Sequence, residues 1–178
     1  MVNDPISQEI LNNLKSTDTD FVLETIEKIR ESGNRLIMEG IVDLLHNTQI
    51  PEIKKSILNL LSELKNKESI PLLLEAIKNE KYLAERKELV ACCWQNGLNY
   101  NEYLPVFIDL VINHSFLIAF EAFTVIENMY GVISDEVIDQ EIVKINNALQ
   151  QADEEKAYLL RGLVTIIRDI PEKSEFSE

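Results

Sequence analysis

The most constraining feature of this chain is residues 53–77, which spell one amphipathic helix, a short break and a second helix that opens at Ile70-Pro71. Apolar residues recur there at helical spacing, so each segment carries one apolar face. A helical hairpin of this kind cannot bury that face alone and must stack on neighbouring hairpins. The segment therefore predicts a helical repeat architecture, and it predicts no reaction.

Composition favours an all-α fold. The 178 residues include only five Gly and five Pro, while 46% are hydrophobic and 27% charged. Few helix breakers and this balance suit a folded helical domain, and they argue against a turn-rich β-sandwich or a disordered chain. Polar residues interrupt residues 103–133, the most apolar stretch, too often for a membrane span. Residues 1–5 lack the basic start and apolar run of a signal peptide, so we expect a cytoplasmic location.

The chain repeats itself with a period of about 34 residues. Pro71 recurs as Pro105 and Gly97 recurs as Gly131, both at a spacing of 34. Three Asn residues that close successive first helices keep nearly the same spacing: Asn47, Asn79 and Asn113. Repeats of this length are typical of stacked helical hairpins.

The apolar pattern predicts ten helices, paired as about five hairpins of one α-α superhelix. The domain is expected to span residues 1–171, and residues 172–178 form a polar C-terminal tail. The ten helices are expected near residues 5–15, 18–31, 34–46, 51–65, 68–79, 82–96, 102–113, 116–130, 135–150 and 154–170. Helix-start signals support these boundaries, with Thr17 or Asp18, Ser134 and Asp153 as capping residues and Pro51 and Pro71 in first turns.

Residues 51–77 resemble the consensus of HEAT repeats, specifically the short bacterial type also found in phycobilisome lyases. The basic pair Lys54-Lys55 follows Pro51 as at the start of that family's second helix. Ser56 stands where the family often has Ala, residues 61–64 replace its Leu-Gly-x-Leu and Asn66 its Asp, and Ile70-Pro71 opens the next helix as in the family. A weaker echo follows at Arg86, Gly97, Leu104-Pro105 and Asn113. The tetratricopeptide repeat has a similar period, but its Trp, Gly, Tyr and Ala pattern is absent.

This resemblance implies a HEAT-like solenoid whose second helices line a concave face and which acts as a protein-binding scaffold. A few relatives of that fold, such as alkylpurine DNA glycosylases, are enzymes with a basic groove for DNA. Both implications rest on fold-level analogy. A protein-binding adaptor and a groove-based enzyme are therefore the two functional classes that the resemblance raises.

Charge is distributed unevenly along the chain. The formal net charge is -14, and no Lys or Arg occurs from Glu88 to Val143. A nucleic-acid binder needs a basic stripe, so we expect no binding to nucleic acid. The acidity has two remaining explanations: attraction of a basic protein partner, as in an inhibitor or immunity-type protein that caps a basic protein, or simple solubility.

No catalytic or metal-binding constellation is found, so we expect neither enzymatic activity nor a cofactor or metal. His46 and His114 have no partner at metal-ligand spacing and are expected to end first helices. Cys92 and Cys93 are adjacent on one helix, cannot clamp a zinc ion together and are expected to be buried and reduced. Trp94 is expected in the core, with a binding anchor as the alternative.

We expect the binding surface on the polar stripes of the second helices. Helix 116–130 has only a narrow polar stripe, so protein must cover most of its circumference, and residues 102–130 could also serve homo-oligomerisation. The candidate partner-contacting residues are Lys55, Asn59, Ser62, Glu85, Glu88, Gln95, Glu121, Thr124, Asn128, Tyr158, Arg161, Thr165 and Arg168.

Overall fold

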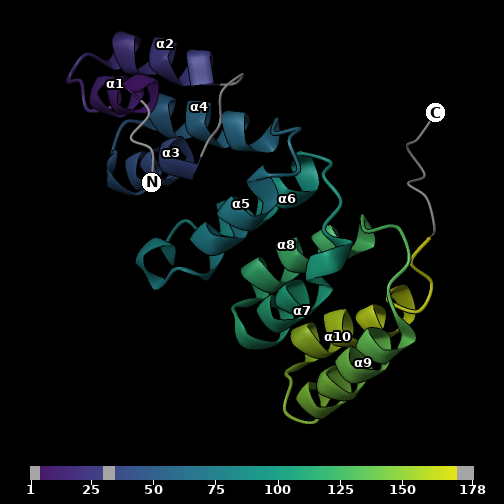
Figure 1. Ribbon diagram of the computed structural model, residues 1–178. Helices are drawn as coiled ribbons and strands as arrows, with labels where there is room; N and C mark the ends of the chain where they lie inside the picture. Colours follow the sequence, from purple (N-terminus) through teal and green to yellow (C-terminus); the bar gives the residue numbers. More distant parts are fainter. Residues whose placement is uncertain (1–4, 30–34, 172–178) are drawn as a thin grey trace. The chain divides into compact units, whose positions relative to one another are not determined.

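The structure is a computed structural model that describes residues 5–29 and 35–171, and these residues form helices, turns and loops with no β-strand (Figure 1). Within these residues ten α-helices follow one another, as the apolar periodicity predicts, and two short 3₁₀ helices that it does not predict precede the sixth and seventh α-helices. The all-α prediction is confirmed. The predicted tail, residues 172–178, lies outside the described residues, as does the predicted end of the second helix at residues 30 and 31.

The chain divides into two compact units, Met1–Leu98 and Asn99–Glu178. The first unit contains α1 Pro5–Asn13, α2 Thr19–Ile29, α3 Arg35–Asn47, α4 Pro51–Ser62, α5 Ser69–Lys78, η1 Glu80–Tyr82 and α6 Arg86–Gln95. The second unit contains η2 Asn101–Tyr103, α7 Leu104–Asn113, α8 Phe116–Glu127, α9 Asp135–Leu149 and α10 Glu154–Ile166. That residues 1–171 act as one domain remains a prediction.

Consecutive helices pair as five hairpins, α1 with α2 through α9 with α10. Inside each unit the hairpins also stack in order: α1 contacts α3 and α3 contacts α5, whereas α2 contacts α4 and α4 contacts α6. In the second unit α7 contacts α9 and α8 contacts α10. First helices therefore pack on first helices and second helices on second helices, which is the arrangement of a helical repeat.

Local sequence explains where several helices begin. The carboxylate of Asp18 accepts hydrogen bonds from the amides of Asp20 and Phe21 at 3.0 and 3.2 Å, so Asp18 rather than Thr17 caps α2. Ser134 accepts from Val137 at 3.4 Å and Asp153 accepts from Lys156 at 2.8 Å. These side chains satisfy amides that a helix start leaves without partners, and the predicted caps are confirmed.

The 34-residue period has a structural basis. Gly97 follows α6 and Gly131 follows α8, and both have positive φ, +69° and +96°. Such a backbone favours glycine because a Cβ is strained there. Asn47 and Asn113 are the last residues of α3 and α7, and Asn79 directly follows the last residue of α5. Residues one period apart therefore occupy equivalent places in successive hairpins.

The helix expected at residues 82–96 is shorter than predicted. The side chain of Asn79 accepts a hydrogen bond from the amide of Lys81 at 3.0 Å, which starts the 3₁₀ turn η1. The chain then turns again, and α6 begins only at Arg86. An Asn side chain that competes for backbone amides in this way is a known reason for a helix to start late.

Candidate functional site

In the first unit, the predicted stripe on α4 meets α6. Lys55 and Asn59 are exposed on α4, and the hydroxyl of Ser62 donates a hydrogen bond to the Gln95 side-chain oxygen at 2.6 Å. Cys92 and Cys93 are buried, as expected, and the Cys92 thiol lies between α4 and α6, 3.7 Å from the carbonyl oxygen of Leu58. Leu58 on α4 contacts Cys92 on α6, and Ser62, four residues later on α4, contacts Gln95, three residues later on α6. The two helices therefore run parallel.

Glu85 does not join that stripe. It precedes α6, and one of its carboxylate oxygens lies 3.0 Å from Nδ1 of His46 near the end of α3. The Glu85 side chain is 13% exposed, and the His46 ring packs edge-on against Tyr82 at 5.7 Å between centroids. The late start of α6 turns Glu85 toward the first helices, where it links two hairpins. Glu88 remains half-exposed on α6, 3.9 Å from the ammonium of Lys87.

Trp94 lies on the surface. Its residue is 37% exposed, so the expectation of a core tryptophan is wrong. The neighbouring Cys93 takes the buried position on α6 instead, at 0% exposure. Helical period alone allowed either residue to face the core.

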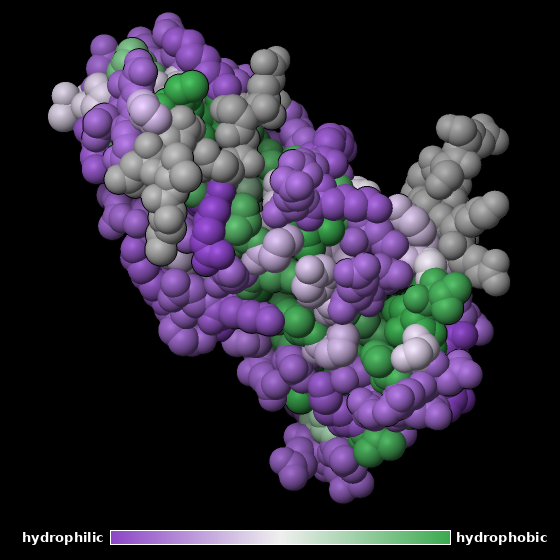
Figure 2. Space-filling model, viewed as in Figure 1, coloured by the Kyte–Doolittle hydropathy of each residue, from purple (hydrophilic) through white to green (hydrophobic). Residues whose placement is uncertain are grey.

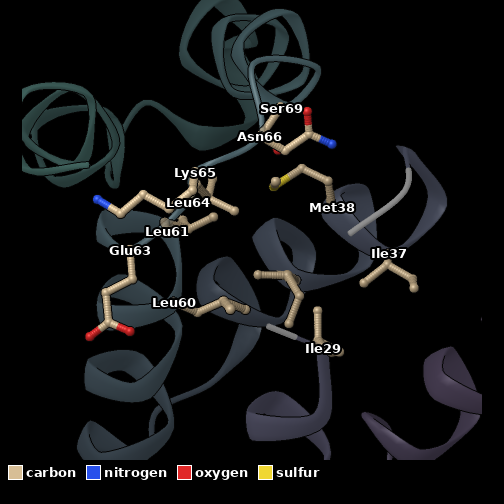
Figure 3. Close-up of a pocket in the computed structure, with 11 residues that line it drawn as sticks. Ile29, Ile37, Met38, Leu60, Leu61, Glu63, Leu64, Lys65, Asn66 and Ser69 are labelled. Carbon is tan, nitrogen blue, oxygen red and sulfur yellow. The ribbon is translucent and has the colours of Figure 1, made fainter. Parts of the chain in front are cut away.

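A cavity of about 280 Å³ lies in the first unit between α2, α3 and α4. Figure 3 shows that apolar side chains such as Ile29, Met38 and Leu60 surround it, whereas the charged ends of Glu63 and Lys65 point away from them. The Lys65 ammonium instead donates to the backbone carbonyl of Asn96 at 2.9 Å. A ligand site needs polar groups that converge on the cavity, so we do not place the functional site here.

In the second unit, the predicted polar residues of α8 largely bond to their own helix. The Thr124 hydroxyl donates to the backbone carbonyl of Phe120 at 3.1 Å, and the side-chain amide of Asn128 donates to the backbone carbonyl of Thr124 at 2.8 Å. Glu121 and Thr124 are half-buried and Asn128 is exposed. The remaining four predicted residues are all exposed, three on α10 and one just beyond its end: Tyr158, Arg161, Thr165 and Arg168.

Large apolar side chains are exposed on the same two helices. We define the apolar patch as Phe116 at 38% exposure, Leu117 at 60%, Phe120 at 50% and Tyr158 at 76%. The rings of Phe116 and Phe120 lie 6.3 Å apart. Helical period could have identified the two Phe residues, because positions 116, 120, 124 and 128 form one line along α8. The sequence predicts that protein covers residues 102–130, but the predicted partner-contacting residues of this helix are all polar side chains.

A cleft of about 300 Å³ lies where α8 and α10 end. We call it the acidic cleft because its charged lining residues are Glu127 and Asp169. It is also lined by Ile126, Asn128, Met129, Tyr130, Thr165, Ile166, Ile170 and Pro171. Burial raises the pKa of the Glu127 carboxyl above its ordinary value. Within the described part of the chain, neither carboxylate forms an ion pair.

The apolar patch and the acidic cleft lie on one face. Phe120 precedes Glu127 by seven residues on α8, and Tyr158 precedes Thr165 by seven on α10, so each pair shares a side of its helix. The two helices run parallel, because a Cβ added to Gly162 would lie 3.1 Å from the Phe123 ring while the ends of both helices line the cleft. The patch therefore lies two turns before the cleft, which is about 10 Å along the helix axes.

Figure 2 shows one side of the molecule, which is mostly hydrophilic with hydrophobic areas in both units. Residues 5–29 and 35–171 contain no group of three His, Cys, Asp or Glu side chains that could hold a metal ion. None of the helices described here has the length and apolar character needed to cross a bilayer. The concave face that would join the stripes of both units remains a prediction, because each unit is described by itself.

No protein-family model matches this chain, and no curated protein matches it. Among solved structures, the chain is similar to a crystal structure of an engineered protein, with 17% sequence identity and a TM-score of 0.46. That similarity covers 94% of this chain and 82% of the engineered protein.

Proposed function

We propose that this chain is a non-enzymatic, HEAT-like interaction module that binds a protein partner on its second helices. The observation that carries the proposal is the apolar patch, in which two phenylalanines, a leucine and a tyrosine are exposed on neighbouring helices. Exposed apolar clusters on a folded domain mark interaction sites, and aromatic side chains contribute much of the energy at protein interfaces. The predicted residues Glu121, Thr124 and Arg161 border this patch.

The acidic surroundings favour a basic partner, as in an inhibitor or immunity-type protein. The three patch residues on α8 lie in the segment without Lys or Arg, and the first turn of α10 adds Glu154 and Glu155 before Tyr158. Complementary charge speeds association and excludes wrong partners. The groove-based enzyme alternative expects a basic groove with a buried carboxylate, whereas no Lys, Arg or His lines the acidic cleft.

The test is affinity capture from extracts of the source cell, followed by measurement of the captured protein's affinity for purified variants. We expect Phe116→Ala with Phe120→Ala to lower that affinity by about tenfold or more. The matched control is Leu83→Ala, which removes a side chain of the first unit that is 50% exposed. Equal binding of the patch variant and the wild type would reject the patch as the interface.

Two further measurements separate the alternatives. Glu121→Lys with Glu127→Lys should slow association with a basic partner, and the wild-type rate should fall between low and physiological salt. An unchanged rate would leave solubility as the explanation of the acidity. Saturable binding of duplex DNA or RNA in an anisotropy titration would instead support the groove-based enzyme.

A further inference from the structure

We infer that the face formed by α8 and α10 binds a basic segment of the partner, with an apolar side chain on the apolar patch and a Lys or Arg side chain in the acidic cleft. This inference rests on the proposed function, since it specifies the chemistry of the partner that the module binds. Its basis is the arrangement of two different surfaces on one pair of parallel helices. An apolar patch alone could bind many kinds of partner. The acidic cleft two helical turns away selects partners that also carry a basic side chain.

Electrostatics favour a cation in the cleft. Glu127 and Asp169 provide two carboxylates, and no Lys, Arg or His is among the lining residues. The C-terminal ends of α8 and α10 meet there, and helix C-termini carry partial negative charge. Burial has already raised the pKa of Glu127, because the ionised carboxylate has lost part of its hydration. A bound ammonium or guanidinium group would restore favourable interactions to that carboxylate.

The size of the cleft suits a side chain. Its volume of about 300 Å³ stands at the lower end of the range of roughly 300–1,000 Å³ that is typical of small-molecule sites. Asn128, Tyr130 and Thr165 add polar groups around the two carboxylates. The cleft therefore fits one long basic side chain that enters from a partner bound along the surface.

The geometry also sets the spacing in the partner. The distance of about 10 Å between patch and cleft equals seven residues of a helix. A helical segment with Leu or Phe seven residues from Lys or Arg matches both surfaces in either direction along α8. Two lysines of this unit have partners of their own: Lys144 is paired with Asp109 and Glu141 at 2.9–3.0 Å, and Lys156 donates to the carbonyls of Ile112 and His114. Arg161 and Arg168 are exposed and do not line the cleft.

The test uses a fluorescein-labelled helical peptide of Ala and Gln with two Leu one turn apart, each followed seven residues later by Arg. A second peptide carries Glu in place of both Arg. We expect the Arg peptide to bind the full chain saturably in an anisotropy titration, and the Glu peptide to bind about tenfold more weakly or not at all. Equal binding of both peptides, or no saturable binding of the Arg peptide, would overturn the inference.

Charge reversal makes the test specific. Glu127→Lys with Asp169→Lys should reverse the preference, so that the Glu peptide binds better than the Arg peptide. The matched control is Glu102→Lys with Asp139→Lys, which changes the net charge equally at exposed positions outside the cleft and should keep the wild-type preference. The same preference in the cleft variant and in the wild type would contradict the inference.

Two other occupants are distinguishable. A chain that ends at Pro171 should bind the Arg peptide as the full chain does, and binding only after that truncation would assign the surface to residues 172–178. Sedimentation should show a monomer, whereas a dimer that dissociates upon Phe120→Ala would assign the surface to a second copy. Loss of peptide binding together with intact, patch-dependent capture of a partner would reject this inference and leave the proposed function standing.

Discussion

The Arg86 guanidinium, at the first residue of α6, donates a hydrogen bond from Nε to the backbone carbonyl of Ile77 near the end of α5, at 2.7 Å. A second nitrogen of Arg86 lies 3.4 Å from the carbonyl of Asn79 and 2.8 Å from the Glu80 carboxylate. Arg86 is 2% exposed. One buried cation thus bonds to carbonyls at the end of α5 and ties the two helices of a hairpin together.

We predict that Arg86→Met lowers the free energy of unfolding by about 2–4 kcal/mol. The variant keeps much of the buried chain but leaves buried carbonyls without their charged donor. Urea unfolding of the two proteins measures the difference. Glu80→Ala is the control, and it should change stability by less than about 0.5 kcal/mol because the Glu80 side chain is 79% exposed. A similar loss in both variants would show that the ion pair, rather than the carbonyl bonds, stabilises the hairpin.

Leu61 and Leu73 are both fully buried, at 0% exposure, as the best-defined repeat predicts. Leu61→Ala and Leu73→Ala should each lower the free energy of unfolding by about 2–5 kcal/mol, because each removes apolar burial and leaves a cavity. Chemical denaturation provides the measurement. Leu83→Ala at a 50% exposed position should cost far less. Stability unaffected by the two core substitutions would contradict the packing.

The glycines one period apart should respond differently to the same substitution. Gly97 has φ of +69° and no atom within 4 Å of an added Cβ, so Gly97→Ala should cost about 1–2 kcal/mol from the left-handed backbone alone. Gly131 has φ of +96°, and an added Cβ would lie 3.0 Å from the side-chain nitrogen of Asn101. Gly131→Ala should therefore cost more, about 2–3 kcal/mol. Equal melting temperatures for both variants and the wild type would contradict this conformational requirement.

Asp43 should contribute pH-dependent stability. Burial raises the pKa of Asp43, but hydrogen bonds from Lys81 and Tyr82 outweigh burial and hold the pKa below its ordinary value of 3.8. The Lys81 ammonium lies 2.5 Å from the carboxylate, and the Tyr82 hydroxyl donates to the same oxygen. A lowered pKa means that the ionised form favours folding. Its contribution is therefore present above pH 3.8 and disappears as the pH falls through the folded-state pKa.

We predict that Asp43→Asn is less stable than the wild type at pH 7 and at pH 5.5, and that the difference shrinks near pH 3. Urea unfolding at the three pH values measures this. Tyr82→Phe removes one donor and keeps the Lys81 ion pair, so it should raise the pKa of Asp43 in an NMR titration. A difference between Asp43→Asn and the wild type that does not depend on pH would contradict the assignment.

Local sequence determined much of the fold. The apolar period predicted ten helices because the spacing of apolar side chains reports helical geometry directly. The caps Asp18, Ser134 and Asp153 were predictable because a capping side chain bonds to amides two or three residues away. The equivalence of Gly97 and Gly131 followed from the 34-residue period. That the repeats belong to the HEAT type, and that both units form one solenoid, remain predictions.

Contacts between residues far apart in the sequence decided the rest. Trp94 and Phe120 are exposed although both are large and apolar. The helices that pack on α6 and α8 cover the faces of these two helices on which Trp94 and Phe120 do not lie. Glu85 bonds to His46 because α6 starts late, and Glu127 and Asp169 share a cleft because α8 and α10 run parallel and end together. Helical period shows which residues share a face, but only tertiary packing determines which face a neighbour covers. The sequence therefore determined the helices of this protein, and the stacking of hairpins decided its surface.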